Sequence, residues 1–203
     1  MSPTRAPRRR SLRSAAALVG AVASALTLAA CSSSSSGGST ANSNYIGGTG
    51  EINVVKPADR HAAPELSGKT VSGGKDSLAA YKGKVVVINI WGSWCASCRE
   101  EAPNLVKVAK AEESKGVQFL GINTRDLDAS NAARYDKTFD IPYPSLFDPY
   151  GKLILRFPKG SLNPQTLPAT MIIDRQGRVA ARALKPLSES ELHQIVDPVA
   201  AEK

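Results

Sequence analysis

The sequence predicts an α/β domain in which helices flank a central mixed sheet. Two β-branched apolar runs, residues 84–91 and 117–124, are too short for buried helices and are typical of strands covered on both faces. A helical pattern separates them, so the two strands are expected to run parallel, joined by a right-handed crossover. Later in the chain, two apolar runs flank Arg175-Gln176-Gly177, which predicts an antiparallel hairpin at the edge of the sheet.

The crossover helix is predicted at residues 100–115, because apolar side chains recur there with helical spacing. Pro103 lies near its first turns and is expected to kink it, and Gly116 ends it. This strand-helix-strand unit brings the amino end of the helix to the carboxyl end of the first strand.

The second half of the chain contains the remaining elements. A helix is predicted at residues 128–139, with Asp128 or Ser130 as its N-cap. It is followed by a short strand, the two hairpin strands and a closing helix capped by Ser188, at residues 145–148, 170–174, 178–183 and 188–196.

Composition and charge limit the number of domains and the class of partner. The 203 residues are 42% hydrophobic and 22% charged, which allows one globular domain with a sizeable core. The formal charge is +8, but residues 1–30 contain five arginines and no acidic residue, so the rest of the chain carries +3. This remaining charge is mixed in sign along the chain, so we expect no nucleic-acid binding.

The amino-terminal residues have the pattern of an export signal. A basic segment precedes the uncharged run of residues 14–30, which is too short for a transmembrane helix, since such a helix needs about 20 apolar residues. The tetrapeptide LAAC, ending at Cys31, resembles a bacterial lipobox. Residues 1–30 are therefore predicted to be a signal peptide and Cys31 to be acylated. The alternatives are ordinary secretion and retention of the segment as an anchor.

The segment after Cys31 is rich in Ser, Gly, Thr and Asn. Residues 31–50 have no hydrophobic period and are predicted to form a flexible tether, with the folded domain at 51–203. The acyl chains on Cys31 would hold this domain at the outer, extracytoplasmic face of a membrane.

Two of the three cysteines, Cys95 and Cys98, are spaced as C-x-x-C where the first strand meets the crossover helix. Unpaired backbone amides and the helix dipole stabilise a thiolate there, so Cys95 is predicted to be the exposed nucleophile and Cys98 the resolving thiol. A purely structural disulfide is disfavoured, because so short a loop contributes little stability. A metal site is disfavoured because the chain has no second cysteine pair, and His61 and His193 lie far apart in sequence.

The dithiol belongs to a longer motif. After the apolar strand come a W-C-x-x-C sequence and then an arginine, an acidic residue, a proline and a leucine, occupied by Trp94, Cys95, Cys98, Arg99, Glu101, Pro103 and Leu105. Over residues 62–197 the chain resembles the thioredoxin-like TlpA/ResA group of extracytoplasmic thiol-disulfide oxidoreductases, which implies a thioredoxin fold. Asn89 stands where cytoplasmic thioredoxins carry a buried acid, and asparagine is usual in this group.

The resemblance also implies a helix-strand insertion followed by a cis-proline opposite the dithiol. Leu167-Pro168, just before the strand at 170–174, matches this proline, and the 69 residues between Cys98 and Pro168 leave room for the insertion. The proline is expected to support the binding of a substrate peptide, whereas an ordinary trans proline is the alternative. The Ala-Ser dipeptide between the cysteines departs from the usual pattern, so the resemblance gives no redox potential.

Other polar and aromatic residues lie near the predicted site. Glu101 could relay protons, but we favour a simple interaction of its charge with the helix amino terminus. Trp91 is predicted to lie in the core and Trp94 at the substrate-facing rim. Asp126 and Arg125 follow a strand end and are predicted to be solvated loop charges.

Together these features predict a membrane-anchored enzyme that exchanges thiols and disulfides outside the cytoplasm. The resemblance implies reduction of protein disulfides, with apocytochrome c as a client and a thiol-reducing membrane donor as the source of electrons. We expect a monomer that needs no cofactor and no metal. A disulfide oxidase or isomerase is an alternative, as is a copper-binding module that would use His193 in the closing helix.

Overall fold

The computed structural model describes residues 52–163 and 165–202. The predicted signal peptide, the acylated Cys31 and the tether at 31–50 lie outside the described residues. Within the described ranges, no helix is both long enough and apolar enough to cross a membrane.

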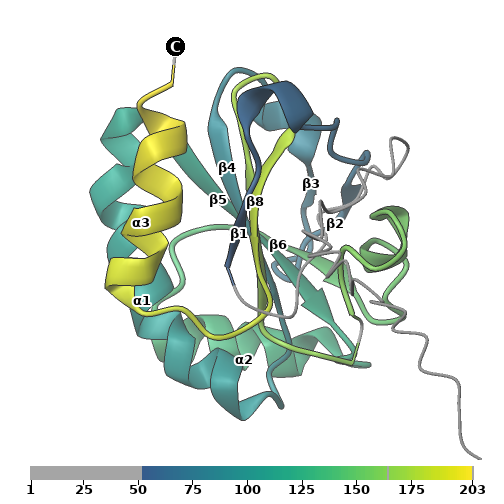
Figure 1. Ribbon diagram of the computed structural model, residues 1–203. Coiled ribbons are helices and arrows are strands. Elements are labelled where there is room, and N and C mark those ends of the chain that lie inside the picture. The colour runs from purple at the N-terminus through teal and green to yellow at the C-terminus, as the bar shows by residue number, and fades with distance from the viewer. Residues whose placement is uncertain (1–51, 164, 203) are drawn as a thin grey trace, which may run out of the picture. The chain divides into compact units, whose positions relative to one another are not determined.

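A mixed sheet forms the centre of the described part of the chain (Figure 1), with six strands in the order β1-β8-β7-β4-β5-β6. These strands are β1 (Asn53–Val54), β4 (Val85–Trp91), β5 (Val117–Thr124), β6 (Ser145–Asp148), β7 (Ala169–Ile173) and β8 (Val179–Ala183). β4, β5 and β6 run parallel, whereas β7 is antiparallel to both β4 and β8. The predicted α/β class, with its parallel unit and its antiparallel hairpin, is confirmed.

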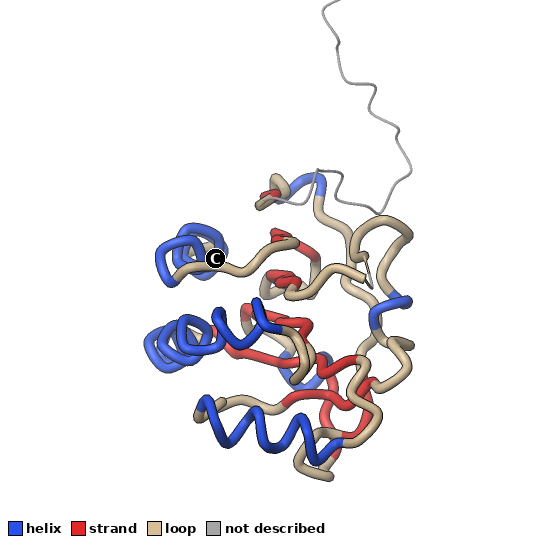
Figure 2. Tube along the Cα trace, turned by 90° about the horizontal axis from the view of Figure 1, so that it is seen from below, coloured by secondary structure: helices blue, strands red, loops and turns tan. Residues whose placement is uncertain are grey.

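Three helices among the described residues cover one face of the sheet: α1 (Ala96–Glu112), α2 (Ala129–Phe139) and α3 (Glu189–Ala200). Figure 2 shows them on the same side of the strands. Successive side chains of a strand point to opposite faces, so Val85 and Val87 pack with α1 and α3, while Val86 and Ile88 pack on the other face. Loops and 3₁₀ turns cover that second face, and one of them contributes the buried Ile154.

The start of α1 differs from the prediction in a way that matters for the site. The helix begins at Ala96 rather than at residue 100, because Cys95 is its N-cap and the Cys95 sulfur accepts the Cys98 N–H. The helix then continues through Pro103, and a 3₁₀ turn follows its carboxyl end. The dithiol therefore lies at the N-cap and in the first turn of α1, at the predicted junction of strand and helix.

The caps of the other two helices agree with the sequence. Asp128 is the N-cap of α2, and its carboxylate accepts a backbone N–H of the first turn. Ser188 is the N-cap of α3, where it forms a reciprocal capping box with Glu191. α3 runs beyond its predicted end, through Pro198 to Ala200.

Three short strands were not predicted. β1 has two residues, and β2 (Ser67–Lys69) and β3 (Lys75–Ser77) have three each and pair with each other. These segments are too short and too polar to show an alternating apolar pattern. β1 is defined only by its pairing with β8, more than a hundred residues further along the chain.

Candidate active site

Cys95 and Cys98 lie where the chain leaves β4 and enters α1. The two sulfurs are joined in a disulfide, with the Cα atoms 5.3 Å apart. Cys95 is 6% exposed and Cys98 is 1% exposed. Both cysteines are therefore buried, so the predicted exposure of Cys95 is wrong, although Cys95 is the more accessible of the two, in the predicted order.

The amino end of α1 stabilises charge on the outer sulfur. The Cys98 N–H donates a hydrogen bond to the Cys95 Sγ at 3.2 Å. Once the disulfide is reduced, this amide and the positive end of the helix dipole favour a thiolate at Cys95. Cys95 is thus suited to be the nucleophile of the pair.

The inner sulfur lies in apolar surroundings. Cys98 belongs to a cluster with Trp91, Ala102, Ala132 and Tyr135. The Trp91 and Tyr135 rings stack with centroids 4.1 Å apart, and the Tyr135 hydroxyl donates to the Cys98 carbonyl at 2.7 Å. Apolar surroundings disfavour the charged form of a thiol, which distinguishes the environment of Cys98 from the helix terminus beside Cys95.

Glu101 lies one turn after Cys98, and its side chain is buried. The carboxylate accepts the Leu187 N–H at 2.9 Å and the Asn89 Nδ2–H at 3.2 Å, and Asn89 also donates to the Thr170 hydroxyl at 3.4 Å. Burial raises the pKa of Glu101 from 4.5 to about 7, although both hydrogen bonds to the carboxylate oppose this increase. The predicted role as a charge at the helix amino terminus is wrong, because this carboxyl faces the interior.

The prediction for Asp126 is also wrong, because this aspartate is buried and holds the loop that leads to the dithiol. Its carboxylate accepts the Ser93 N–H at 2.8 Å, the Ser93 hydroxyl at 2.6 Å and the Asn123 amide at 2.7 Å. Ser93 lies two residues before Cys95, so these bonds connect the end of β5 to the start of the active-site turn. An aspartate after a strand is usually solvated, and no local signal distinguishes this one.

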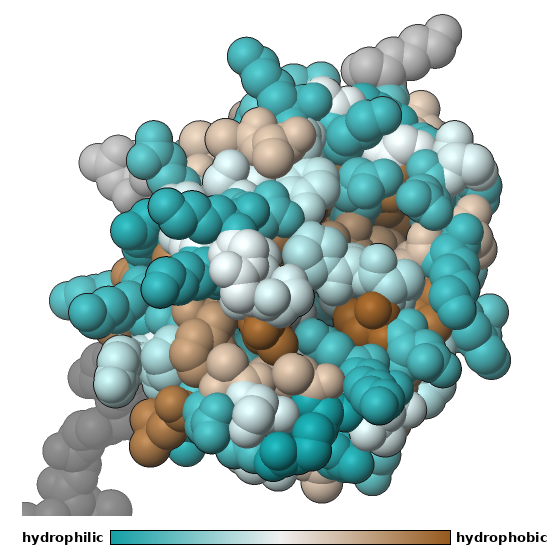
Figure 3. Space-filling model, turned by 180° about the vertical axis from the view of Figure 1, so that it is seen from behind, coloured by the Kyte–Doolittle hydropathy of each residue, from teal (hydrophilic) through white to brown (hydrophobic). Residues whose placement is uncertain are grey.

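The rim of the site is formed by an exposed aromatic residue and a strand entrance. The face of the molecule shown in Figure 3 is mostly hydrophilic, with separate apolar patches. Trp94 is 49% exposed, and the Arg125 guanidinium lies over its ring, 4.5 Å from the centroid. Leu167 packs against the cluster that contains both cysteines, and the Leu167–Pro168 bond is cis, as predicted. Trp91, by contrast, is buried in the core.

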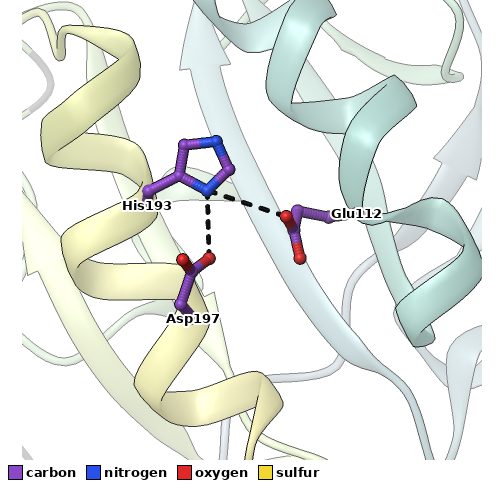
Figure 4. A group of neighbouring side chains, drawn as sticks. All are labelled: Glu112, His193 and Asp197. Atoms are coloured by element: carbon purple, nitrogen blue, oxygen red, sulfur yellow. Dashed lines mark hydrogen bonds and ion pairs between the residues drawn. The ribbon is translucent and has the colours of Figure 1, made fainter.

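The copper-binding alternative required His193 to approach the cysteines. Instead the His193 Nδ1 lies 3.6 Å from the Glu112 Oε1, at the carboxyl end of α1 (Figure 4). A helix rises 1.5 Å per residue, so Glu112 is about 20 Å from Cys98 along α1. A metal site that combines His193 with the dithiol is therefore not formed.

The fold and the site together define a thiol-disulfide oxidoreductase with a C-x-x-C active site on a thioredoxin fold. The chain belongs to the AhpC/TSA family, whose family model matches residues 60–182. The matched residues include the dithiol, the buried Glu101 and Pro168.

Individual relatives agree with this assignment. The chain is 24% identical over 162 residues to the thiol-disulfide oxidoreductase ResA of Bacillus cereus, covering 80% of this chain and 87% of that protein. A solved DsbF homologue from Corynebacterium diphtheriae superimposes with a TM-score of 0.70 at 32% identity, covering 75% of this chain and 94% of that one. A secreted thiol-disulfide isomerase from Corynebacterium glutamicum has a TM-score of 0.70 at 27% identity, with 75% and 93% covered. The predicted resemblance and the predicted enzyme class are confirmed.

Proposed function

We propose that this protein is a membrane-anchored, extracytoplasmic reductase of protein disulfides. The direction of electron flow is inferred from the buried carboxyl of Glu101, one turn from Cys98. A nearby carboxylate and apolar surroundings both disfavour a thiolate. The reduced dithiol is then less stabilised than in a strong oxidant such as DsbA, whose reduced form is unusually stable. Such a pair gives up its electrons readily.

The proposed reaction has two exchange steps. The Cys95 thiolate attacks one sulfur of a client disulfide, and the other client sulfur leaves as a thiolate that takes up a proton from water. The Cys98 thiol then loses its proton to the Glu101 carboxylate and attacks the Cys95 sulfur in the mixed disulfide. The second client sulfur leaves as a thiolate and takes up a proton from water, while Glu101 returns its proton to solvent, so the client gains two thiols and Cys95–Cys98 becomes a disulfide. A carboxyl with a pKa near 7 can both accept and return this proton at neutral pH.

The proposed partners follow from the chemistry of the cycle and from the resemblance to the TlpA/ResA group. The Cys95–Cys98 disulfide must be reduced again by a thiol-reducing donor in the membrane, and an acylated Cys31 would keep the domain within its reach. The resemblance implies apocytochrome c as a client, because its haem-binding cysteines must be reduced. The half-exposed Trp94, and Leu167 where it packs against the cluster of the two cysteines, offer apolar surface on which a protein client can dock.

A reduction potential distinguishes the reductase from the oxidase or isomerase. We expect a value near that of thioredoxin, about −270 mV, whereas a value near about −120 mV, as in DsbA, would indicate an oxidase. The full-length protein in detergent would be equilibrated with dithiothreitol or glutathione buffers. The free thiols would then be alkylated and counted by gel shift.

Trapping tests the exchange mechanism and identifies the clients. In Cys98→Ser the resolving step is blocked, so mixed disulfides at Cys95 should accumulate in cells and disappear on treatment with dithiothreitol. Cys95→Ser is the matched control, because it keeps one thiol but lacks the nucleophile. If the two variants capture the same proteins to the same extent, Cys95 is not the attacking thiol and the proposal is wrong.

A further inference from the structure

A second group of side chains that could bind a ligand, two carboxylates and an imidazole, lies at the end of α1 that is far from the dithiol. Glu112 of α1 faces His193 and Asp197 of α3 (Figure 4). The His193 Nδ1 is 3.0 Å from the Asp197 Oδ1 and 3.6 Å from the Glu112 Oε1. One ligand atom from each of the three residues lies within 4.8 Å of the others.

The buried carboxylate of this cluster is only partly satisfied. The Glu112 side chain is 1% exposed, and its Oε1 is bonded to the Lys115 ammonium at 2.7 Å. Its Oε2 is buried without any hydrogen-bond partner among the described residues. Buried carboxylate oxygens are normally paired, coordinated or hydrogen-bonded, so an oxygen with no partner needs an explanation.

The spacing of the three side chains fits a small divalent cation. Imidazole nitrogen and carboxylate oxygen bind Zn²⁺ at roughly 2.0–2.2 Å, and a tetrahedral arrangement separates such ligand atoms by about 3.4 Å. The two separations from the His193 Nδ1, 3.0 and 3.6 Å, lie on either side of that value. The third separation, between the Glu112 and Asp197 oxygens, is within 4.8 Å, so side-chain rotation would bring these two oxygens to the distance that a shared cation requires.

We infer that Glu112, His193 and Asp197 form a binding site for Zn²⁺ or a similar divalent cation, with water in the fourth position. The Lys115 side chain is 59% exposed, so its ammonium can move into solvent when the cation takes its place. The cation would be coordinated by the Glu112 carboxylate, one oxygen of which has no hydrogen-bond partner among the described residues. It would also join the carboxyl end of α1 to α3, and so stabilise the packing of these two helices.

The inferred cation site lies away from the dithiol, so the experiment must distinguish zinc bound at this site from zinc bound by Cys95 and Cys98. The dithiol can itself bind zinc when it is reduced. The full-length chain would therefore be oxidised, so that Cys95 and Cys98 form their disulfide, and any other thiol would be blocked by alkylation. Zinc chloride would be titrated into this protein by calorimetry in a metal-free buffer, and thermal unfolding would be followed with and without zinc.

The two histidines of the chain provide a matched pair of variants. We expect one Zn²⁺ per chain for the wild type and for His61→Ala, whose side chain is exposed, with a higher melting temperature in zinc. In His193→Ala the affinity should fall at least tenfold and the zinc-dependent increase in melting temperature should vanish. Asp197→Asn, at an exposed position, should weaken binding in the same direction. Absence of zinc binding by the wild type, or equal binding by wild type and His193→Ala, would overturn the inference.

Discussion

Replacing Glu101 with glutamine is predicted to change how the stability of the protein depends on pH. Burial raises the pKa of Glu101 from 4.5 to about 7. A pKa that is raised on folding means that the protonated carboxyl stabilises the folded state. This stabilisation is fully present below pH 4.5 and is lost as the pH rises through about 7. The difference between the two pKa values corresponds to about 3 kcal/mol of unfolding free energy.

Glutamine cannot ionise in this range, yet its side-chain oxygen can still accept the Leu187 N–H. Between pH 4.5 and about pH 8, the unfolding free energy of the wild type should therefore fall by about 3 kcal/mol relative to that of Glu101→Gln. Urea unfolding of the oxidised proteins at a series of pH values measures this difference. Glu100→Gln is the matched control, because Glu100 is exposed and should leave the profile unchanged. Parallel curves for the wild type and Glu101→Gln would refute the reasoning.

Two further substitutions test the surroundings of the dithiol. Asp126→Ala should lower the unfolding free energy by about 2 kcal/mol or more, because it removes the buried acceptor of the Ser93 and Asn123 donors. A loss below about 1 kcal/mol in urea unfolding would contradict the structural role given to Asp126. Trp94→Ala should change the unfolding free energy by no more than about 0.5 kcal/mol, because the ring is half exposed. The same substitution should slow the reduction of insulin severalfold and leave the exchange with glutathione unchanged. Equal slowing with both substrates would show that Trp94 acts on the dithiol and not on a protein client.

The two acidic residues that were misjudged from the sequence, Glu101 and Asp126, share one property. One lies in a helix and the other after a strand, and acidic residues at such positions are solvated in most proteins. Each is buried here because a segment distant in the sequence covers it: the Leu187 backbone for Glu101 and the Ser93 turn for Asp126. Local patterns carry no information about such a partner, so neither the burial nor the raised pKa of Glu101 could be predicted.

The sequence by itself determined the fold class and the dithiol, and the family resemblance indicated the cis-proline. β4, β5 and the hairpin of β7 and β8 are apolar runs whose length and branching specify strands, Cys95 and Cys98 belong to a local motif, and Pro168 matches a family feature. Only the tertiary structure decided what lies around these residues. It buried the Glu101 carboxyl against the Leu187 backbone and brought His193 to the far end of α1, because contacts between elements depend on how the helices pack and not on the period of any single segment.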